Sequence, residues 1–495
     1  MTEFELKFEI PPARFKGVKA AVQRGQATQQ RLQARYFDTP DHLLAAHGVV
    51  VRLRKEGRRW VQTAKAPGRR PLERLEHNVA LGVQATPLLD LARHEDAAVG
   101  ACIRHALKLK PGETFPALVM VYSSNILRVS RLLRVRGTVV EIALDQGHIA
   151  AGNHTLPVSE LELELKQGQP ASAAAVAASW CARHGLWLSS VSKSMKGQRL
   201  ALGQPFGTAT GASPMDYSRQ VAGRAMAAAV VSNCLDQILP NASDVAGGCT
   251  DGDTIHQLRV GIRRLRTALR ELAGMADDWD GHGQAWEAAL VAVFRELGQH
   301  RDRDYLIHKL QAQIKAAGGP VLDWRDALSD LPNPAAAVRS PAFQQTLLGL
   351  IGWVHATDSV PDRAGKAPQK ALRKRLTSLH SQVLSQGQQF SALHEPAQHS
   401  LRKRLKRLRY LAEFALPLFS ARKVKAYLAE LKPLQDALGT YQDELAALQA
   451  WQALSGHEPR ALFGTGWLSA RREPHVLACQ QACERLGRKA RPFWD

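Results

Sequence analysis

The sequence has few cysteines and no long hydrophobic run. Its six cysteines include no C-x-x-C pair, which argues against a disulfide framework or a zinc ribbon and favours a reducing compartment. His475, Cys479 and Cys483 follow a helical spacing that is more typical of packing than of a metal site. No stretch is apolar for long enough to span a bilayer, and the N-terminus begins on a charged segment rather than a signal peptide. We therefore expect a cytoplasmic protein.

Acidic residues are also scarce relative to basic ones. The chain has 66 Lys and Arg against 45 Asp and Glu, a formal charge of +21. The excess is present in both halves, with 29 basic against 17 acidic residues in 1–200 and 37 against 28 in the remainder. A field of this sign attracts polyanions, namely nucleic acid, anionic membrane or polyphosphate. The length of 495 residues predicts two or more domains.

The first ten residues alternate between charged and apolar side chains. Glu3, Glu5, Lys7 and Glu9 share one face of the predicted strand, and apolar side chains share the other. Two carboxylates on neighbouring positions of one face repel each other unless a cation lies between them. A divalent metal on Glu3 and Glu5, with Lys7 on an anion that also contacts the metal, would relieve this repulsion. The alternative is the solvated face of an edge strand.

Further strands are predicted over residues 31–38, 48–56, 60–65, 128–135 and 139–144, and Asp145-Gln-Gly147 has the composition of a turn. Residues 160–166 repeat the opening pattern, with acidic side chains and Lys166 on one face and leucines on the other. Because these charged faces carry both signs, we expect the strands to form a barrel with the charges inside. Metal ions and a bound polyanion would then satisfy acids and bases together.

The first 200 residues contain a series of short motifs in a fixed order, namely Glu3-x-Glu5-x-Lys7, Tyr36-Phe37-Asp38-Thr39, Arg52-x-Arg54, Thr63-x-Lys65, Glu141-x-x-x-Asp145-x-Gly147, Glu160-Leu-Glu-Leu-Glu-Leu-Lys166-x-Gly168 and Ser192-Lys193. This ordered set resembles the CYTH domain, the triphosphate tunnel enzymes, over essentially all of residues 1–200. The resemblance implies an eight-stranded antiparallel barrel whose tunnel binds a triphosphate with Mg²⁺ or Mn²⁺ and hydrolyses it. Two positions depart from the family: Asn78 stands where a second carboxylate is frequent, and Arg131 is an alternative to Arg128.

The resemblance assigns roles by position. Phosphoryl transfer needs charge neutralisation on the phosphate oxygens and an oriented water, which cations, metals and a nearby carboxylate supply. The catalytic candidates are Glu76, Glu160 and Lys65. The substrate would be held by Lys7, Arg52, Arg54, Lys65, Arg128 and Lys193. The metal would be held by Glu3, Glu5, Asp145, Glu162 and Glu164.

Residues 203–214 are rich in Gly, Pro, Ser and Thr and are predicted to be a linker between a domain over 1–202 and a helical domain over 215–495. In the helical domain two basic stripes stand out, and neither contains an acid. One runs from His256 through Arg259, Arg263 and Arg266 to Arg270, and the other repeats its spacing 143 residues later. Solvated helix faces usually mix charges. The repeat indicates an internal duplication whose two stripes flank a shared anion site.

The second half resembles the CHAD domain over about residues 215–495. The resemblance implies two pseudo-symmetric four-helix bundles around a basic cavity that binds inorganic polyphosphate. It implies that Asp302 and Asp443 hold basic side chains in place. The residues assigned to polyphosphate are His256, Arg259, Arg263, Arg266, His399, Arg402, Lys406, Arg409 and Lys432.

Three functions remain open from the sequence. The first is a metal-dependent inorganic triphosphatase that hydrolyses tripolyphosphate and binds polyphosphate through its helical domain, with association with polyphosphate granules as an option. The second is a polyphosphate-binding or targeting protein whose barrel has little or no activity. The third, a nucleic-acid binder, is disfavoured because grooves for single strands interleave aromatic residues, whereas aromatics are 6% of this chain. The preferred triphosphate, the choice of metal and the oligomeric state are not determined.

Overall fold

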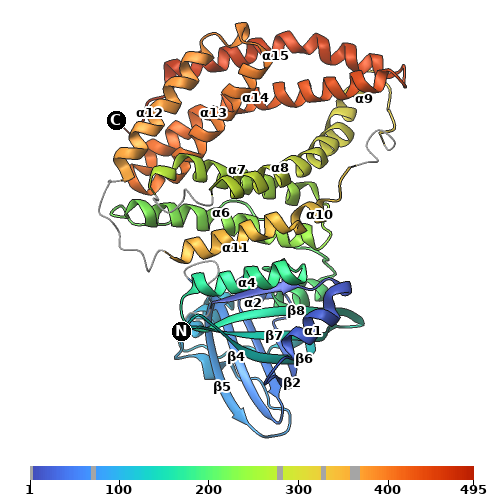
Figure 1. Ribbon diagram of the computed structural model, residues 1–495, viewed down its shortest axis with the longest axis vertical. Coiled ribbons are helices and arrows are strands. Elements are labelled where there is room, and N and C mark those ends of the chain that lie inside the picture. Colours follow the sequence, from blue (N-terminus) through green and yellow to red (C-terminus); the bar gives the residue numbers. More distant parts are fainter. Residues whose placement is uncertain (1–3, 69–73, 276–282, 325–330, 357–367, 495) are drawn as a thin grey trace. The chain divides into compact units, whose positions relative to one another are not determined.

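The computed structural model describes residues 4–68, 74–275, 283–324, 331–356 and 368–494. The chain forms two compact units. Unit 1 comprises residues 1–209, 242–249 and 339–356, and unit 2 comprises residues 210–241, 250–338 and 357–495. The predicted order of an antiparallel β domain followed by a helical domain is confirmed (Figure 1).

Unit 1 is built on one antiparallel sheet with the strand order β5-β4-β3-β2-β6-β7-β8-β1-β9. The family resemblance implied eight strands in a closed barrel. The sheet has nine strands because Trp187–Leu188 pairs with β1, and within the described residues the hydrogen-bonding order ends at β5 and β9. The strands are β1 Glu5–Glu9, β2 Thr28–Asp38, β3 Val50–Glu56, β4 Arg59–Pro67, β5 Arg74–Gly82, β6 Val119–Val135, β7 Thr138–Ala151, β8 His154–Gln167 and β9 Trp187–Leu188.

The predicted turn at Asp145-Gln-Gly147 is wrong. Strand β7 continues through these residues to Ala151, and the β6–β7 turn lies at Arg136–Gly137, where both residues have positive φ. Gly147 has a different purpose: a Cβ there would collide with the backbone of Asn125 and Ile126 on β6. The glycine therefore allows a close approach of two strands rather than a reversal of the chain.

The alternating strands bury their apolar faces beneath helices. Phe8 and Leu161 are fully buried and Leu6 and Leu163 nearly so, and helix α4 packs over β1, β7 and β8. Each such side chain contributes about 1.5–3 kcal/mol. A second core lies between β3, β4 and helices α2 and α3. The helices of unit 1 are α1 Phe15–Val22, α2 Leu43–Ala46, α3 Ala98–Ala106, α4 Pro170–His184, α5 Lys193–Ala201 and α11 Pro341–His355.

Helix α11 belongs to unit 1 although it lies far along the chain. It packs along α4, whose alanines permit a close approach: a Cβ on Gly352 would lie 3.3 Å from the methyl group of Ala174. Gln345 donates a hydrogen bond from Nε2 to the carbonyl of Ala178 at 2.9 Å. Segments more than 150 residues apart in sequence therefore form one compact unit.

Unit 2 is helical. Helices α12, α13, α14 and α15 pack against one another, and α7 packs against both α8 and α13. The buried faces of α7 and α13 are lined by leucines such as Leu258, Leu265, Leu401 and Leu408. The helices are α6 Gly223–Ala246, α7 Gly252–Glu271, α8 Gly283–Asp304, the π-helix η4 Tyr305–Leu310, α9 Gln311–Ala316, α10 Pro334–Arg339, α12 Pro368–Gly387, α13 Glu395–Phe414, α14 Ala421–Ser455 and α15 Ala461–Lys489. Residues up to Asn241 of α6 belong to unit 2, and the last turn belongs to unit 1.

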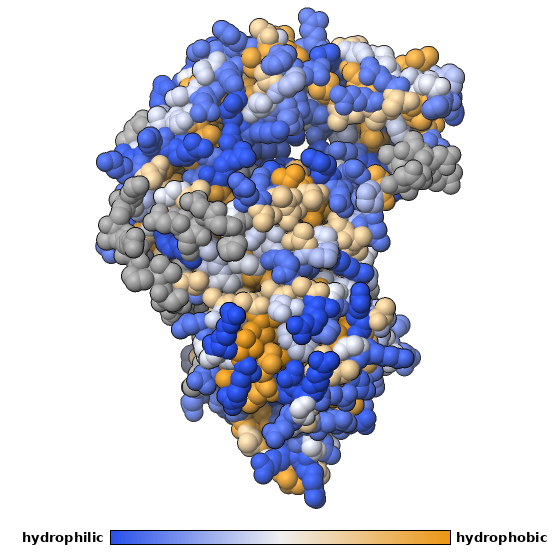
Figure 2. Space-filling view, in the orientation of Figure 1, coloured by the Kyte–Doolittle hydropathy of each residue, from blue (hydrophilic) through white to orange (hydrophobic). Residues whose placement is uncertain are grey.

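Hydrophilic side chains cover most of the face shown in Figure 2. Among the helices that the structure describes, none has the length and hydropathy needed to cross a membrane. The cysteines behave as small apolar groups: Cys479 and Cys483 are buried on α15, and His475 pairs with Glu444 rather than with them. Their helical spacing therefore reflects packing.

Candidate active site and anion-binding stripe

The charged face of the sheet in unit 1 gathers acids and bases from non-adjacent parts of the chain. The pairing register places Lys7 opposite Glu162, Glu160 opposite Asp145, and Asp145 opposite Arg128. Because these residues alternate with buried leucines, isoleucine and phenylalanine, they all lie on one side of the sheet. The period-2 pattern of the sequence thus produces a charged surface.

Lys193 lies at the centre of an acidic cluster. Its Nζ lies 2.7 Å from Asp145, 2.6 Å from Glu160 and 2.6 Å from Glu162. Arg128 forms a two-point ion pair with Asp145 at 2.7 and 2.6 Å and also contacts Glu162. The side chains of Asp145 and Glu160 are fully buried. Buried carboxylates need such partners, because an unpaired charge away from water is costly.

The cations control the ionisation of this cluster. Burial by itself raises the pKa of a carboxyl group, but Lys193 and Lys196 outweigh it and lower the pKa of Glu160 to about 2. Lys193 and Arg128 likewise hold the pKa of Glu162 well below its usual range. Burial lowers the pKa of Lys193, yet Glu162, Glu160 and Asp145 raise it well above normal. All of these groups are charged at neutral pH.

Glu5 has the opposite behaviour. The side chain of Glu5 is exposed to solvent, yet protein atoms lie on most sides of it. The resulting desolvation, followed by the negative charge of Glu162, raises the pKa of Glu5 to about 7. The charge of Glu162 thus acts on Glu5, as expected for carboxylates that share one face. Glu3, the other predicted metal ligand of this strand, lies outside the described residues. Glu164 is occupied by Lys166 at 2.6 Å, and Lys166 also contacts Glu141 at 3.0 Å.

Arginines on β3 present unused hydrogen-bond donors. The Nε atoms of Arg52 and Arg54 are buried and have no hydrogen-bond partner within the part of the chain that the structure describes. Arg54 pairs with Glu56, and Arg52 lies 3.5 Å from the hydroxyl of Tyr36. Burial opposes ionisation of Tyr36, but Arg52 outweighs it and lowers the pKa of that hydroxyl. Buried donors without acceptors are expected at a site that receives an anion.

The remaining predicted residues of this face lie on β4 and β5. Lys65 forms an ion pair with Glu76. Asn78, at the position where the family often has a carboxylate, donates to Glu76 at 3.0 Å and accepts from Thr63 at 2.7 Å. Asn78 therefore orients Glu76 instead of adding a negative charge.

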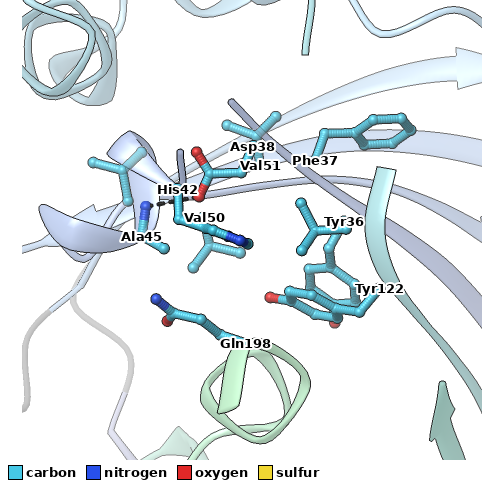
Figure 3. Close-up of a pocket in the computed structure, with 11 residues that line it drawn as sticks. Tyr36, Phe37, Asp38, His42, Ala45, Val50, Val51, Tyr122 and Gln198 are labelled. Carbon is cyan, nitrogen blue, oxygen red and sulfur yellow. Dashed lines mark hydrogen bonds between the residues drawn. The ribbon is translucent and has the colours of Figure 1, made fainter. Parts of the chain in front are cut away.

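A small pocket lies beside the stacked rings of Tyr36 and Tyr122, whose centroids are 4.4 Å apart. Figure 3 shows Gln198 of α5 facing this pocket from the side opposite Asp38 and His42. Asp38 accepts backbone N–H groups from Thr39 at 2.7 Å and from Leu44 and Ala45 at 2.9 Å. Asp38 therefore caps the short helix α2, which explains its place in the sequence motif.

The structure decides between the two arginines that the motifs left open, and it adds one lysine that the motifs did not indicate. Arg128 and not Arg131 faces the carboxylates; Arg131 donates to the carbonyl of Ala21 at 3.3 Å. Lys196 was missed, although it contacts both Glu9 and Glu160 at 2.6 Å. The spacing Lys193-x-x-Lys196 at the start of a helix was the available signal, because residues three apart share a helix face.

In unit 2 the two basic stripes come together, because α7 packs against α13. Arg259, Arg263 and Arg266 surround the ring of Phe294 at 4.3, 5.1 and 5.8 Å, and Arg259 donates to its carbonyl at 2.8 Å. His399 donates from Nδ1 to Gln442 at 2.8 Å. Burial followed by neighbouring arginines lowers the pKa of His256, and burial followed by Arg263 lowers that of Arg259 to about 10.

Arg301 was also missed as a member of this site. It forms a two-point ion pair with Asp443 at 2.9 and 2.6 Å, and Asp443 lies 3.5 Å from Arg402. The Leu-Gly-x-x-Arg sequence around Arg301 was the signal for it. Lys406 lies beside them, and burial together with Arg263 and Arg402 lowers its pKa to about 6. Such a concentration of cations attracts anions.

Three predicted residues are already paired with acids outside this cluster. Arg266 contacts Glu287 at 2.6 Å, Arg409 contacts Glu413 at 2.8 Å, and Lys432 contacts Asp436 at 2.9 Å. The side chain of Lys432 is 73% exposed. Arg266 nevertheless shares the ring of Phe294 with Arg259 and Arg263. The residues whose charges act on one another are His256, Arg259, Arg263, Arg402 and Lys406.

The two halves of the chain match different family models. Residues 1–197 match the model of the CYTH domain, and residues 229–452 match that of the CHAD domain. The chain is a CYTH domain followed by a CHAD domain.

Several known proteins are similar to it. An inorganic triphosphatase of Haemophilus influenzae is 32% identical over 136 residues, which are 27% of this chain and 35% of the relative. The match thus spans about a third of that protein. An uncharacterised protein of Mycobacterium tuberculosis (strain CDC 1551 / Oshkosh) is 26% identical over 90% of this chain and 87% of its own length. The crystal structure of the CHAD domain from the plant Ricinus communis, at 26% identity, covers 56% of this chain and 97% of its own with a TM-score of 0.48.

Proposed function

We propose that this chain is a metal-dependent inorganic triphosphatase. The CYTH domain and the partial similarity to an inorganic triphosphatase support hydrolysis of a phosphoanhydride. The finer proposal is that the CYTH domain hydrolyses tripolyphosphate to pyrophosphate and phosphate, and that the CHAD domain binds inorganic polyphosphate. The observation that carries it is the charged face of unit 1, where buried arginine donors without acceptors lie on the same side of the sheet as a carboxylate cluster.

The cations of this face suit a triphosphate. Arg52 and Arg54 offer N–H donors that the described protein leaves unused, and arginine matches phosphate oxygens in geometry as well as charge. Lys7 and Lys65 add point charges from β1 and β4. Neutralising the phosphate oxygens is the main requirement for phosphoryl transfer, so these residues would both bind the substrate and stabilise its transition state.

The residues present also fit Mg²⁺ or Mn²⁺. Both metals prefer carboxylate oxygens, and Glu5 is a water-accessible carboxylate whose pKa is raised to about 7 by desolvation and then by the nearby charge of Glu162. Among the described residues, no group of three or more His, Cys, Asp or Glu side chains is arranged to hold a metal ion. We assign the metal to Glu5 and Glu162, with Asp145, Glu164 and Glu3 as further candidates. When bound, the metal would supply charge neutralisation and lower the pKa of a water molecule.

Glu160 and Glu76 have different parts in this proposal. Glu160 is fully buried and held by two lysines, which suits an anchor for Lys193 and Lys196 more than a proton acceptor. Glu76 is partly accessible, ionised beside Lys65 and oriented by Asn78, so it can accept a hydrogen bond from an attacking water.

The decisive experiment is phosphate release from tripolyphosphate with Mg²⁺ or Mn²⁺ by the wild type and Glu162→Gln. We expect release to depend on the metal and to fall at least about a hundredfold in the variant, because an acid that touches both Arg128 and Lys193 is neutralised. Glu458→Gln is the control: Glu458 pairs with Arg460 on an exposed part of the chain, so its loss should change nothing.

A second function is favoured by one observation. Arg128, Lys193 and Lys196 already pair with Asp145, Glu160 and Glu162, which makes these carboxylates less available to a metal ion, while Arg52 and Arg54 keep unused donors for an anion. In that case the chain would be a polyphosphate-binding protein with a weakly active CYTH domain. Absence of phosphate release with either metal, from protein that still binds long-chain polyphosphate, would establish this alternative.

A further inference from the structure

Helix α5 carries Lys193 and Lys196, which contact the acidic cluster. Few interactions within the helix itself stabilise it. It spans nine residues, and Ser192 caps its first turn by accepting from Met195 N at 3.2 Å. Isolated helices of this length are marginal in water. The contacts that place α5 must therefore come from elsewhere in unit 1.

Arg199, near the end of α5, is held by a carboxylate from a distant segment. Its guanidinium donates to Asp244 at 2.6 and 3.2 Å, and the two side chains are 16% and 6% exposed. The backbone N–H of Gly207 also donates to Asp244 at 3.1 Å. Asp244 thus ties α5 to the chain that follows it, in a buried environment where a charged pair with several hydrogen bonds is strong.

Two further contacts hold the residues that lead into α5. The N–H of Ser190 donates to the hydroxyl of Ser243 at 2.9 Å, and the N–H of Leu188 donates to the side-chain oxygen of Gln344 at 2.8 Å. Gln344 is 1% exposed. The segment from β9 to the end of α5 is therefore fixed by residues 45 to 156 positions further along the chain.

We propose that Asp244 is a positioning residue for the triphosphate site, which holds helix α5 so that Lys193 and Lys196 lie across the carboxylates of β7 and β8. Ser243 and Gln344 hold the entry to the helix in the same way. Asp244 and Gln344 lie within the stretch of sequence that matches the CHAD model, so this segment would serve the CYTH site. The proposal rests on the function proposed above.

Gly207 provides an independent way to disturb the same contact. A Cβ at this position would collide with the guanidinium of Arg199 and lie 3.2 Å from Asp244. Gly207→Ala therefore keeps every charge but displaces Arg199. Glu444 supplies the matched control, since it is equally buried at 5% and forms a two-point ion pair with Arg471 in unit 2.

The test compares full-length wild type, Asp244→Ala, Gly207→Ala and Glu444→Ala by amide hydrogen exchange and by steady-state kinetics with tripolyphosphate. We expect the first two variants to exchange the amides of α5 about tenfold faster or more and to raise KM, with kcat/KM reduced about tenfold to a hundredfold. Glu444→Ala should leave both unchanged. Asp244→Glu, which keeps the charge, should recover part of the loss.

Normal exchange in α5 of Asp244→Ala would overturn the proposal. So would a fall in kcat with KM unchanged, because that result means a smaller folded fraction rather than a misplaced helix. If the wild type releases no phosphate, the proposed function fails, but the exchange of α5 and the calorimetric affinity for tripolyphosphate still decide whether Asp244 holds the helix.

Discussion

Lys406 is a buried amine among arginines, and its protonation is linked to the stability of the fold. The amine is surrounded by Arg263, Arg402 and Arg301, and burial is the largest reason that its pKa falls from 10.5 to about 6. The folded protein therefore binds fewer protons here than the unfolded chain between pH 6 and 10.5. Consequently this residue makes stability rise with pH in that window, and it destabilises the fold at neutral pH. An arriving polyanion would restore the proton.

Replacing this amine should separate stability from binding. We expect Lys406→Met to raise the free energy of unfolding at pH 7 by about 1 kcal/mol. The reason is that burial and the neighbouring arginines disfavour a charged amine here, whereas methionine is apolar and of similar length. Its affinity for long-chain polyphosphate should fall. Urea unfolding and calorimetric titration measure the two effects, with the exposed Lys423→Met as control. A variant that is less stable and binds as before would contradict this view of Lys406.

His94 is a second group whose protonation is linked to folding. Gln62 exchanges hydrogen bonds with the backbone of Asp90 at 2.6 and 3.1 Å and donates to Nε2 of His94 at 2.9 Å. His94 is thus an acceptor at Nε2, and its Nδ1 meets Nδ1 of His77 at 2.9 Å. Burial, followed by His77, lowers the pKa of His94 from 6.5 to about 4.

This shift predicts sensitivity to acid. Between pH 6.5 and 4, His94 is protonated in the unfolded chain but neutral in the folded state. The free energy of unfolding therefore falls as pH falls through this range, by on the order of 2 kcal/mol. His94→Gln keeps an acceptor for Gln62 and should flatten this part of the pH profile. Chemical unfolding at several pH values tests it. An unchanged slope in the variant would assign the acid sensitivity to other groups.

At the level of elements, α5 also depends on a glycine. A Cβ on Gly197 would collide with the ring of Tyr122 on β6. We expect Gly197→Ala to push α5 away from the sheet and to reduce triphosphatase activity about tenfold or more, with loss of stability. Gly466→Ala, in open space on α15, should instead stabilise by about 0.5–1 kcal/mol. Phosphate release and urea unfolding distinguish the two; equal activity would show that α5 tolerates the displacement.

Local sequence patterns predicted secondary structure correctly where one face of a strand or helix is apolar and the other is charged. The alternation over residues 160–166 correctly predicts β8, because its leucines must be buried and its acids must meet cations. The pattern failed at Gly147, since composition cannot distinguish a glycine that reverses the chain from one that lets two strands approach. That distinction depends on the neighbouring strand.

At the scale of the whole molecule, unit 1 is incomplete without later segments. A fragment of residues 1–202 lacks Ser243, Asp244 and α11, which contact Ser190, α5 and α4. We expect the fragment to be less stable than the full chain by on the order of a few kcal/mol, because buried apolar and polar contacts are lost. Thermal unfolding, followed by the far-UV circular dichroism of the β-sheet, measures this difference. Equal unfolding temperatures would mean that α11 contributes little.

The sequence by itself determined which faces are charged, which sign prevails, and which helices carry basic stripes, because side-chain periodicity and residue type are local properties. Its basic stripes therefore indicated Arg263 and Lys406 as site candidates, and the resemblance to the CYTH domain added Lys193 and Glu162. Only the tertiary structure decided the pairings among them, the positions of Lys196 and Arg301, and the membership of residues 242–249 and 339–356 in unit 1. These depend on contacts between segments far apart in the chain, which the spacing of residues within a segment does not specify.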